Sequence, residues 1–140
     1  MVQLKVWARV GPTEKGDAVI TALESFFPEL DFKVEQDIAV GKGKGKDLLD
    51  ALRQKIWAKQ ILDTAREMLL RRIDGDLTEL LIHKQAAYAK KMVLVNGDSG
   101  SPLGAIHIEI QSKQLEAIIE WIAPETVKGE PVKGIIAKLE

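Results

Sequence analysis

Apolar and polar residues alternate along three stretches of the chain, which is the pattern of a strand with one buried face. These stretches are residues 2–10, 32–40 and 106–110. Residues 77–83 and 92–95 are short apolar runs next to turn-forming sequences, and they also predict strands. The pattern therefore predicts five strands, the first of them at the very start of the chain.

Other stretches repeat their apolar residues at helical spacing. The first ends at Pro28 and has Thr13 or Asp17 as a candidate N-cap, since both residue types accept hydrogen bonds from a helix start. The last covers residues 115–122, and residues 84–91 form a short helix or a bend. These elements lie between the predicted strands.

The segment 47–73 is also helical in pattern, but its apolar face changes side. Leu52 and Ile61 lie half a turn apart on a helical projection. Two interpretations follow. Either the helix breaks near residues 56–59, or it is continuous and buried on two sides, which would require a partner chain or a covering element.

The order of the elements predicts an α+β fold, with a largely antiparallel sheet and helices packed on one face. The 140 residues suit one domain, residues 1–140, with an irregular tail after about residue 126. The hydrophobic fraction of 46% and the charged fraction of 29% are those of a globular protein. We therefore expect a single α+β domain with a substantial core.

Charge is segregated along the chain although its total is −1. Residues 41–91 hold 12 basic and 7 acidic residues, whereas residues 1–40 and 92–140 each hold 4 and 7. A basic middle between acidic flanks predicts a surface that meets an anion, and nucleic acid is the usual large anion.

Residues 41–46 alternate glycine and lysine immediately before a predicted helix. They fail the P-loop pattern, because three residues separate Gly41 from Gly45 and Asp47 follows Lys46. Lysines on a flexible loop at a helix start could still close on phosphate. The alternative is a solvated surface loop.

Lys59, Asp63 and Arg66 share one face of the predicted helix. They form either a surface salt-bridge ladder or a site in which Asp63 orients Arg66 toward a phosphate. Arg71 and Arg72 follow near the helix end, where positive charge also suits the helix dipole.

Residues 84–91 contain three lysines and no acid. Tyr88 among them could stack on a base, or could lie half-buried over small alanines. The three tryptophans are assigned to the core. The residues predicted to bind RNA are Lys42, Lys44, Lys46, Lys59, Arg66, Arg71, Arg72, Lys84, Tyr88, Lys90 and Lys91.

Nothing in the sequence predicts catalysis, a metal or a cofactor. The chain has no cysteine, and the spacing of its two histidines, His83 and His107, matches no ligand motif. Its serines lack the context of known nucleophiles. The chain starts without a signal-peptide pattern and has no apolar run of about 18 residues, so we expect a cytoplasmic protein with no membrane segment.

Six short motifs together resemble an uncharacterised archaeal family that is usually labelled RNA-binding. They are Pro12-Thr13-Glu14, Phe26-Phe27-Pro28, residues 60–66, Lys84-Gln85-Ala86-Ala87, Pro102-Leu103-Gly104 and residues 121–126. The resemblance implies a fold like that of the large-subunit ribosomal protein that binds five-S RNA. It also implies a homodimer and, from fused members, a link to a P-loop domain that looks like a nucleotide kinase.

The sequence thus favours a non-enzymatic protein that binds the backbone and shape of RNA through its basic central segment. The alternative is a protein-interaction module, such as a dimeric partner of a kinase-like protein. An enzyme acting on a phosphorylated small molecule comes third. A continuous basic patch would favour RNA, whereas basic residues scattered among acidic ones would favour the protein partner.

Overall fold

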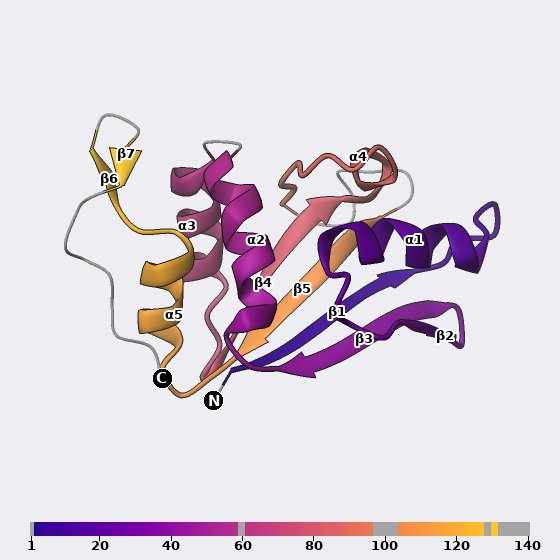
Figure 1. Cartoon of the computed structure of the whole chain (residues 1–140), viewed down its shortest axis with the longest axis horizontal. Coiled ribbons are helices and arrows are strands. Elements are labelled where there is room, and N and C mark those ends of the chain that lie inside the picture. Colours follow the sequence, from indigo (N-terminus) through magenta and orange to yellow (C-terminus); the bar gives the residue numbers. More distant parts are fainter. Residues whose placement is uncertain (1, 59–60, 97–103, 128–129, 132–140) are drawn as a thin grey trace.

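The central feature of the fold is a five-stranded antiparallel sheet, in the order β2-β3-β1-β5-β4 (Figure 1). The computed structural model describes residues 2–58, 61–96, 104–127 and 130–131. The strands are β1 (Gln3–Arg9), β2 (Lys33–Glu35), β3 (Ile38–Lys44), β4 (Leu77–His83) and β5 (Ala105–Gln111). The N-terminal strand therefore occupies the centre of the sheet, as in the predicted antiparallel α+β class.

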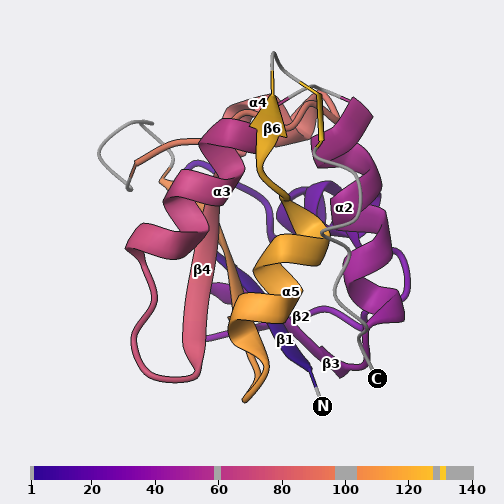
Figure 2. The same ribbon diagram turned by 90° about the vertical axis from the view of Figure 1, so that its left-hand side faces the viewer.

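The helices lie on one side of this sheet (Figures 1 and 2). They are α1 (Gly16–Phe26), α2 (Asp47–Ala58), α3 (Leu62–Arg71), α4 (Lys84–Tyr88) and α5 (Leu115–Ile122). Helix α1 covers β1 and β3, while α5 lies between α2 and α3 at the other end (Figures 1 and 2). None of the helices among the described residues is long and apolar enough to cross a membrane.

The predicted alternation of β1 is confirmed and fixes which sheet face is buried. Leu4, Val6 and Ala8 have at most 2% of their surface exposed and point toward the helices. Their partners on β5, Ile110, Ile108 and Ile106, are equally buried. Burial of these aliphatic side chains against the helices is the main stabilising contribution to the sheet.

The predicted strand 32–40 is in fact a hairpin of two strands, β2 and β3. Its two turn residues, Gln36 and Asp37, have φ of 48° and 65°. Positive φ at both positions is the geometry that matches the twist of a two-residue hairpin. The usual signal for such a turn is Asn-Gly or Asp-Gly, and this chain lacks it.

The glycine-lysine segment is not a flexible loop, because residues 41–44 belong to β3 and pair with β1. Gly41 and Gly43 face the helices, where a Cβ on Gly41 would lie 2.6 Å from the Phe32 ring. Lys42 and Lys44 consequently point to the other face. Gly45, with φ of 107°, ends the strand in a conformation that favours glycine.

The segment 47–73 consists of two helices, so the interpretation with a break is correct. Leu52 and Ile56 are buried from α2, and Ala65 and Leu69 are buried from α3. Each helix buries one face, which explains why the apolar stripe changes side. The break itself falls partly on residues outside the described ranges.

Three smaller predictions need correction. Lys15 is at the N-cap of α1 and no side chain caps the helix, so Thr13 and Asp17 do not have the predicted role. In the predicted strand 92–95 only Leu94 forms a bridge, to Ile82. The predicted irregular tail begins with a small hairpin of β6 (Thr126–Val127) and β7 (Glu130–Pro131), and the remaining tail lies outside the described residues.

Candidate nucleic-acid interface

The sheet face turned away from the helices carries polar and aromatic side chains, and we call it the open face. Residues directly opposite each other on antiparallel strands point to the same face. The register therefore places Lys42, Lys5 and Glu109 side by side, with Glu79 next on β4. The open face is defined here by Lys5, Trp7, Lys42, Lys44, Glu79, His107 and Glu109.

One end of the open face is basic. Lys5, Lys42 and Lys44 line a shallow pocket of about 380 Å³ together with Gln3, Gln111 and one carboxylate, that of Glu109. Within the described ranges, none of these three lysines makes an ion pair. Like charges on neighbouring strands are mutually unfavourable. An anion bound between the ammonium groups would relieve this repulsion.

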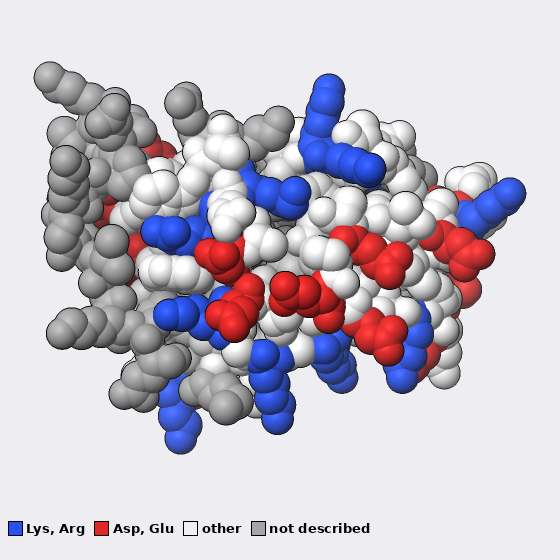
Figure 3. All heavy atoms as spheres, in the orientation of Figure 1, with Lys and Arg blue, Asp and Glu red and all other residues white. Residues whose placement is uncertain are grey.

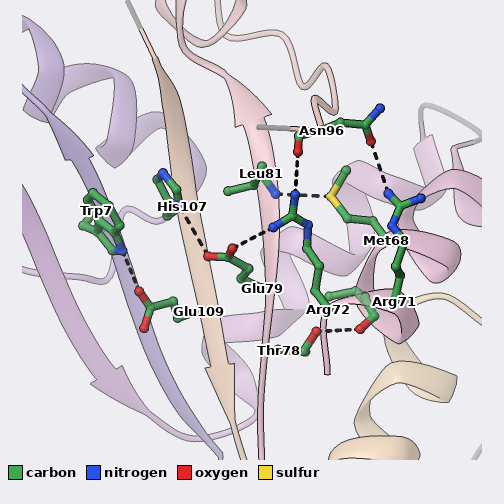
Figure 4. A network of polar contacts seen from close by, with 11 residues as sticks. Trp7, Met68, Arg71, Arg72, Thr78, Glu79, Leu81, Asn96, His107 and Glu109 are labelled. Atoms are coloured by element: carbon green, nitrogen blue, oxygen red, sulfur yellow. Dashed lines mark hydrogen bonds and ion pairs between the residues drawn. The ribbon is translucent and has the colours of Figure 1, made fainter. Parts of the chain in front are cut away.

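The middle of the open face carries an aromatic pair, Trp7 on β1 and His107 on β5. Their rings are stacked, with centroids 4.0 Å apart and planes inclined by 6°. The Trp7 indole donates a hydrogen bond of 2.6 Å to Glu109 Oε2, and His107 Nδ1 lies 3.3 Å from Glu79 Oε2 (Figure 4). Two carboxylates therefore hold the stacked rings in position.

Arg72 reaches the open face from the end of α3, around the edge at β4 (Figure 4). Its guanidinium is 2.9 Å from Glu79 Oε1 and also donates to the backbone carbonyl of Asn96 at 2.5 Å. Arg71 contacts the side chains of Asn96 and Glu67 at 3.2 and 3.3 Å. Glu79 is thus balanced by an arginine, and both predicted arginines lie at this edge.

Lys84, predicted to bind RNA, is instead buried. Its side chain is 1% exposed and forms an ion pair of 2.6 Å with Glu14, which is 4% exposed. Lys84 also donates to the carbonyl of Arg9, and the Tyr88 hydroxyl donates to Glu14. Since the ammonium of Lys84 is enclosed by these partners, the residue belongs to the core and not to a binding surface.

The same cluster shifts two pKa values. Burial alone would raise the pKa of Glu14, but hydrogen bonds from Lys84, Tyr88 and the Gly11 amide outweigh it and lower the pKa. Burial, followed by the hydrogen bond to Glu14 and its charge, raises the pKa of Tyr88. Tyr88 is 37% exposed, so part of its ring remains accessible.

Arg66 joins two helices. Its guanidinium lies 2.5 Å from Glu120 on α5 and 3.5 Å from Glu125, and it donates to the carbonyl of Ala123. Only 17% of the Arg66 side chain is exposed. Neither hypothesis drawn from the sequence named these partners, because they lie more than 50 residues away along the chain.

The other predicted residues are dispersed. Lys46 lies near Trp121, with its ammonium 5.7 Å from the ring centroid. Lys90 and Lys91 are exposed beyond the end of α4, and Lys59 lies outside the described residues. Of the predicted set, the structure brings Lys42 and Lys44 together on β3 and Arg71 and Arg72 together at the β4 edge. It also adds Lys5, which the sequence analysis missed.

The helix-covered face has no single basic field. Figure 3 shows it with lysine and arginine side chains interspersed with acidic ones. Among the described residues there is also no group of three potential metal ligands of the types His, Cys, Asp and Glu. The basic end of the open face is therefore the strongest candidate for an anion site.

Comparison with known proteins identifies the family of this chain. A family model described as RNA binding matches residues 3–112. UPF0201 proteins of Metallosphaera sedula and Pyrococcus abyssi are 36% and 39% identical to this chain, over 94% of it and 94% and 96% of their own lengths. The crystal structure of a UPF0201 protein from Methanococcus jannaschii has 26% identity and a TM-score of 0.78, covering 94% of this chain and 99% of that one. By these matches in sequence and structure, the chain belongs to the archaeal UPF0201 family.

Proposed function

We propose that this protein binds RNA through the open face of its sheet. The observation that carries the proposal is the cluster of Lys5, Lys42 and Lys44, whose charges have no ion-pair partner among the described residues. The match to a family model described as RNA binding supports the same conclusion. Phosphate groups are the anions that such a cluster would meet along an RNA chain.

Binding of this kind is driven by release of counterions when lysines neutralise phosphates. Three lysines, with the exposed Arg9 on the same face, would neutralise roughly three or four phosphates. For a single strand, the log of the affinity should then fall with the log of salt with a slope of about −2 to −3. No catalytic step is part of this proposal.

The test compares two double variants that remove the same charge. Lys42→Ser/Lys44→Ser changes the open face, whereas Lys90→Ser/Lys91→Ser changes exposed lysines next to α4. We expect the first variant to bind RNA more weakly and to reduce the salt slope by about 1.4, while the second keeps wild-type affinity. An equal loss in both, or no binding by the wild type at low salt, would refute the proposal.

The structure removes the main argument for the alternative, a protein-interaction module. It rested on a continuous helix with two apolar faces, but α2 and α3 are separate helices that each bury one face. Four expectations from the sequence stay predictions: a homodimer, a kinase-like partner, a single domain over residues 1–140, and a likeness to the ribosomal five-S-RNA-binding protein. Sedimentation of the purified protein would test the first of these.

A further inference from the structure

The open face has a second chemical feature beside its lysines, the stacked pair of Trp7 and His107. Resting on the proposed function, we infer that this face takes single-stranded RNA, with a nucleobase stacked on Trp7, whose ring is backed by His107, and an adjacent phosphate in the Lys5, Lys42 and Lys44 pocket. Nucleobases stack on aromatic side chains whatever their sequence, because each base has a π-face.

Spacing along β1 supports this arrangement. Lys5 and Trp7 are two residues apart on one strand, so they point to the same face about 7 Å from each other. That separation is comparable with the distance from phosphate to base within one nucleotide. A single nucleotide could therefore contact the basic pocket and the aromatic pair at the same time.

The aromatic pair is fixed before any ligand arrives. The hydrogen bond from Trp7 to Glu109 and the contact of His107 with Glu79 hold both rings, and Arg72 in turn holds Glu79. Trp7 is half-buried and His107 is only 9% exposed, so Trp7 offers the accessible ring and His107 supports it from behind. A preorganised aromatic surface loses little conformational entropy on binding, which favours stacking.

The carboxylates explain why a single strand fits better than a duplex. Glu79 lies on β4, beyond β5, and Glu109 borders the lysine pocket opposite Lys5, while the three lysines lie on β1 and β3. A duplex presents phosphates on two strands and keeps its bases stacked inside, so one backbone would approach the carboxylates and no base would reach Trp7. A single strand can follow the lysines and turn its bases toward the rings.

The experiment uses the full chain and three RNA probes: a single strand of about ten nucleotides, the same strand with its central bases removed to leave abasic sugars, and a duplex of the same length. Wild-type protein should bind the intact single strand most tightly. Trp7→Leu should lose about 5- to 100-fold for that strand but bind the abasic strand like the wild type. Trp57→Phe, which changes a tryptophan on α2, is the matched control and should behave like the wild type.

The outcomes separate this inference from the proposed function. If duplex and single strand bind equally, or if Trp7→Leu binds the intact strand as the wild type does, the inference is overturned while RNA binding by the lysines stands. If no probe binds at low salt, both fail. The circular dichroism spectrum of Trp7→Leu must match that of the wild type. If Trp7→Leu unfolds, Trp7→Phe replaces it in the same comparison, with a smaller loss of affinity expected for the intact strand.

Discussion

The buried ion pair between Lys84 and Glu14 makes a strong prediction about stability. Lys84→Met removes the ammonium but retains most of the volume of the side chain. It leaves the Glu14 carboxylate, only 4% exposed, with hydrogen bonds from Tyr88 and the Gly11 amide alone. It also removes the hydrogen bond to the Arg9 carbonyl at the end of β1.

The expected loss follows from the depth of the pair. Breaking a buried ion pair at one end costs about 3–5 kcal/mol, because the remaining charge is left in a poorly solvated site. A domain of this size has a total stability of about 5–15 kcal/mol. At about 2–4 °C per kcal/mol, the midpoint of thermal unfolding should fall by roughly 6–20 °C.

A double-mutant cycle identifies the cause. Glu14→Gln removes the charge of the partner, so Glu14→Gln/Lys84→Met leaves no buried charge behind. We expect the double variant to be less destabilised than the sum of the two single variants by about 1–3 kcal/mol. Urea unfolding at pH 7, followed by tryptophan fluorescence, gives the four free energies of unfolding. Additive losses, or a cost below about 1 kcal/mol for Lys84→Met, would refute the argument.

Three further predictions concern pH, packing and the helix contact. The pKa of Glu14 is lower in the folded chain than its usual 4.5, so the carboxylate stabilises the fold above that pH and this stabilisation is lost as the pH falls through the folded pKa. The free energy of unfolding, measured from about pH 6 to about pH 3, should therefore fall less steeply for Glu14→Gln than for the wild type. Gly41→Ala should cost about 1–2 kcal/mol in urea unfolding, because its methyl group would clash with Phe32, whereas Lys42→Ala should cost almost nothing. Arg66→Ala should cost about 1.5–3 kcal/mol and leave RNA affinity unchanged; a cost below about 1 kcal/mol would indicate a surface ladder instead.

The sequence predicted those elements whose periodicity is carried by apolar side chains. Strands β1, β4 and β5 and helices α1 and α5 are of this kind, and they lie where the pattern placed them. The second half of β3 was missed because its inward positions are glycines, which add nothing to a hydrophobic pattern. Its alternation of glycine and lysine nevertheless has a period of two, the period of a strand.

The candidate site was predicted only in part for a different reason. A count of charge along the chain identified Lys42 and Lys44, but it could not add Lys5, which joins them through the pairing of β1 with β3. It also included Lys84, because burial beside Glu14, 70 residues away, leaves no trace in a charge count. The assignment of Trp7 to the core was wrong, although the alternation of β1 already placed this residue opposite the buried face.

The central position of β1 has a consequence for synthesis of the protein. Strand β1 is made before both of its neighbours, and one of them, β5, ends only at Gln111. After β3 is complete at Lys44, a ribosome adding about 5–20 residues per second needs roughly 3–13 s to reach that point. During this interval the nascent hairpin presents an unpaired strand edge, the feature that most readily recruits another chain. A second nascent copy can therefore compete with β5 for this edge until β5 is complete.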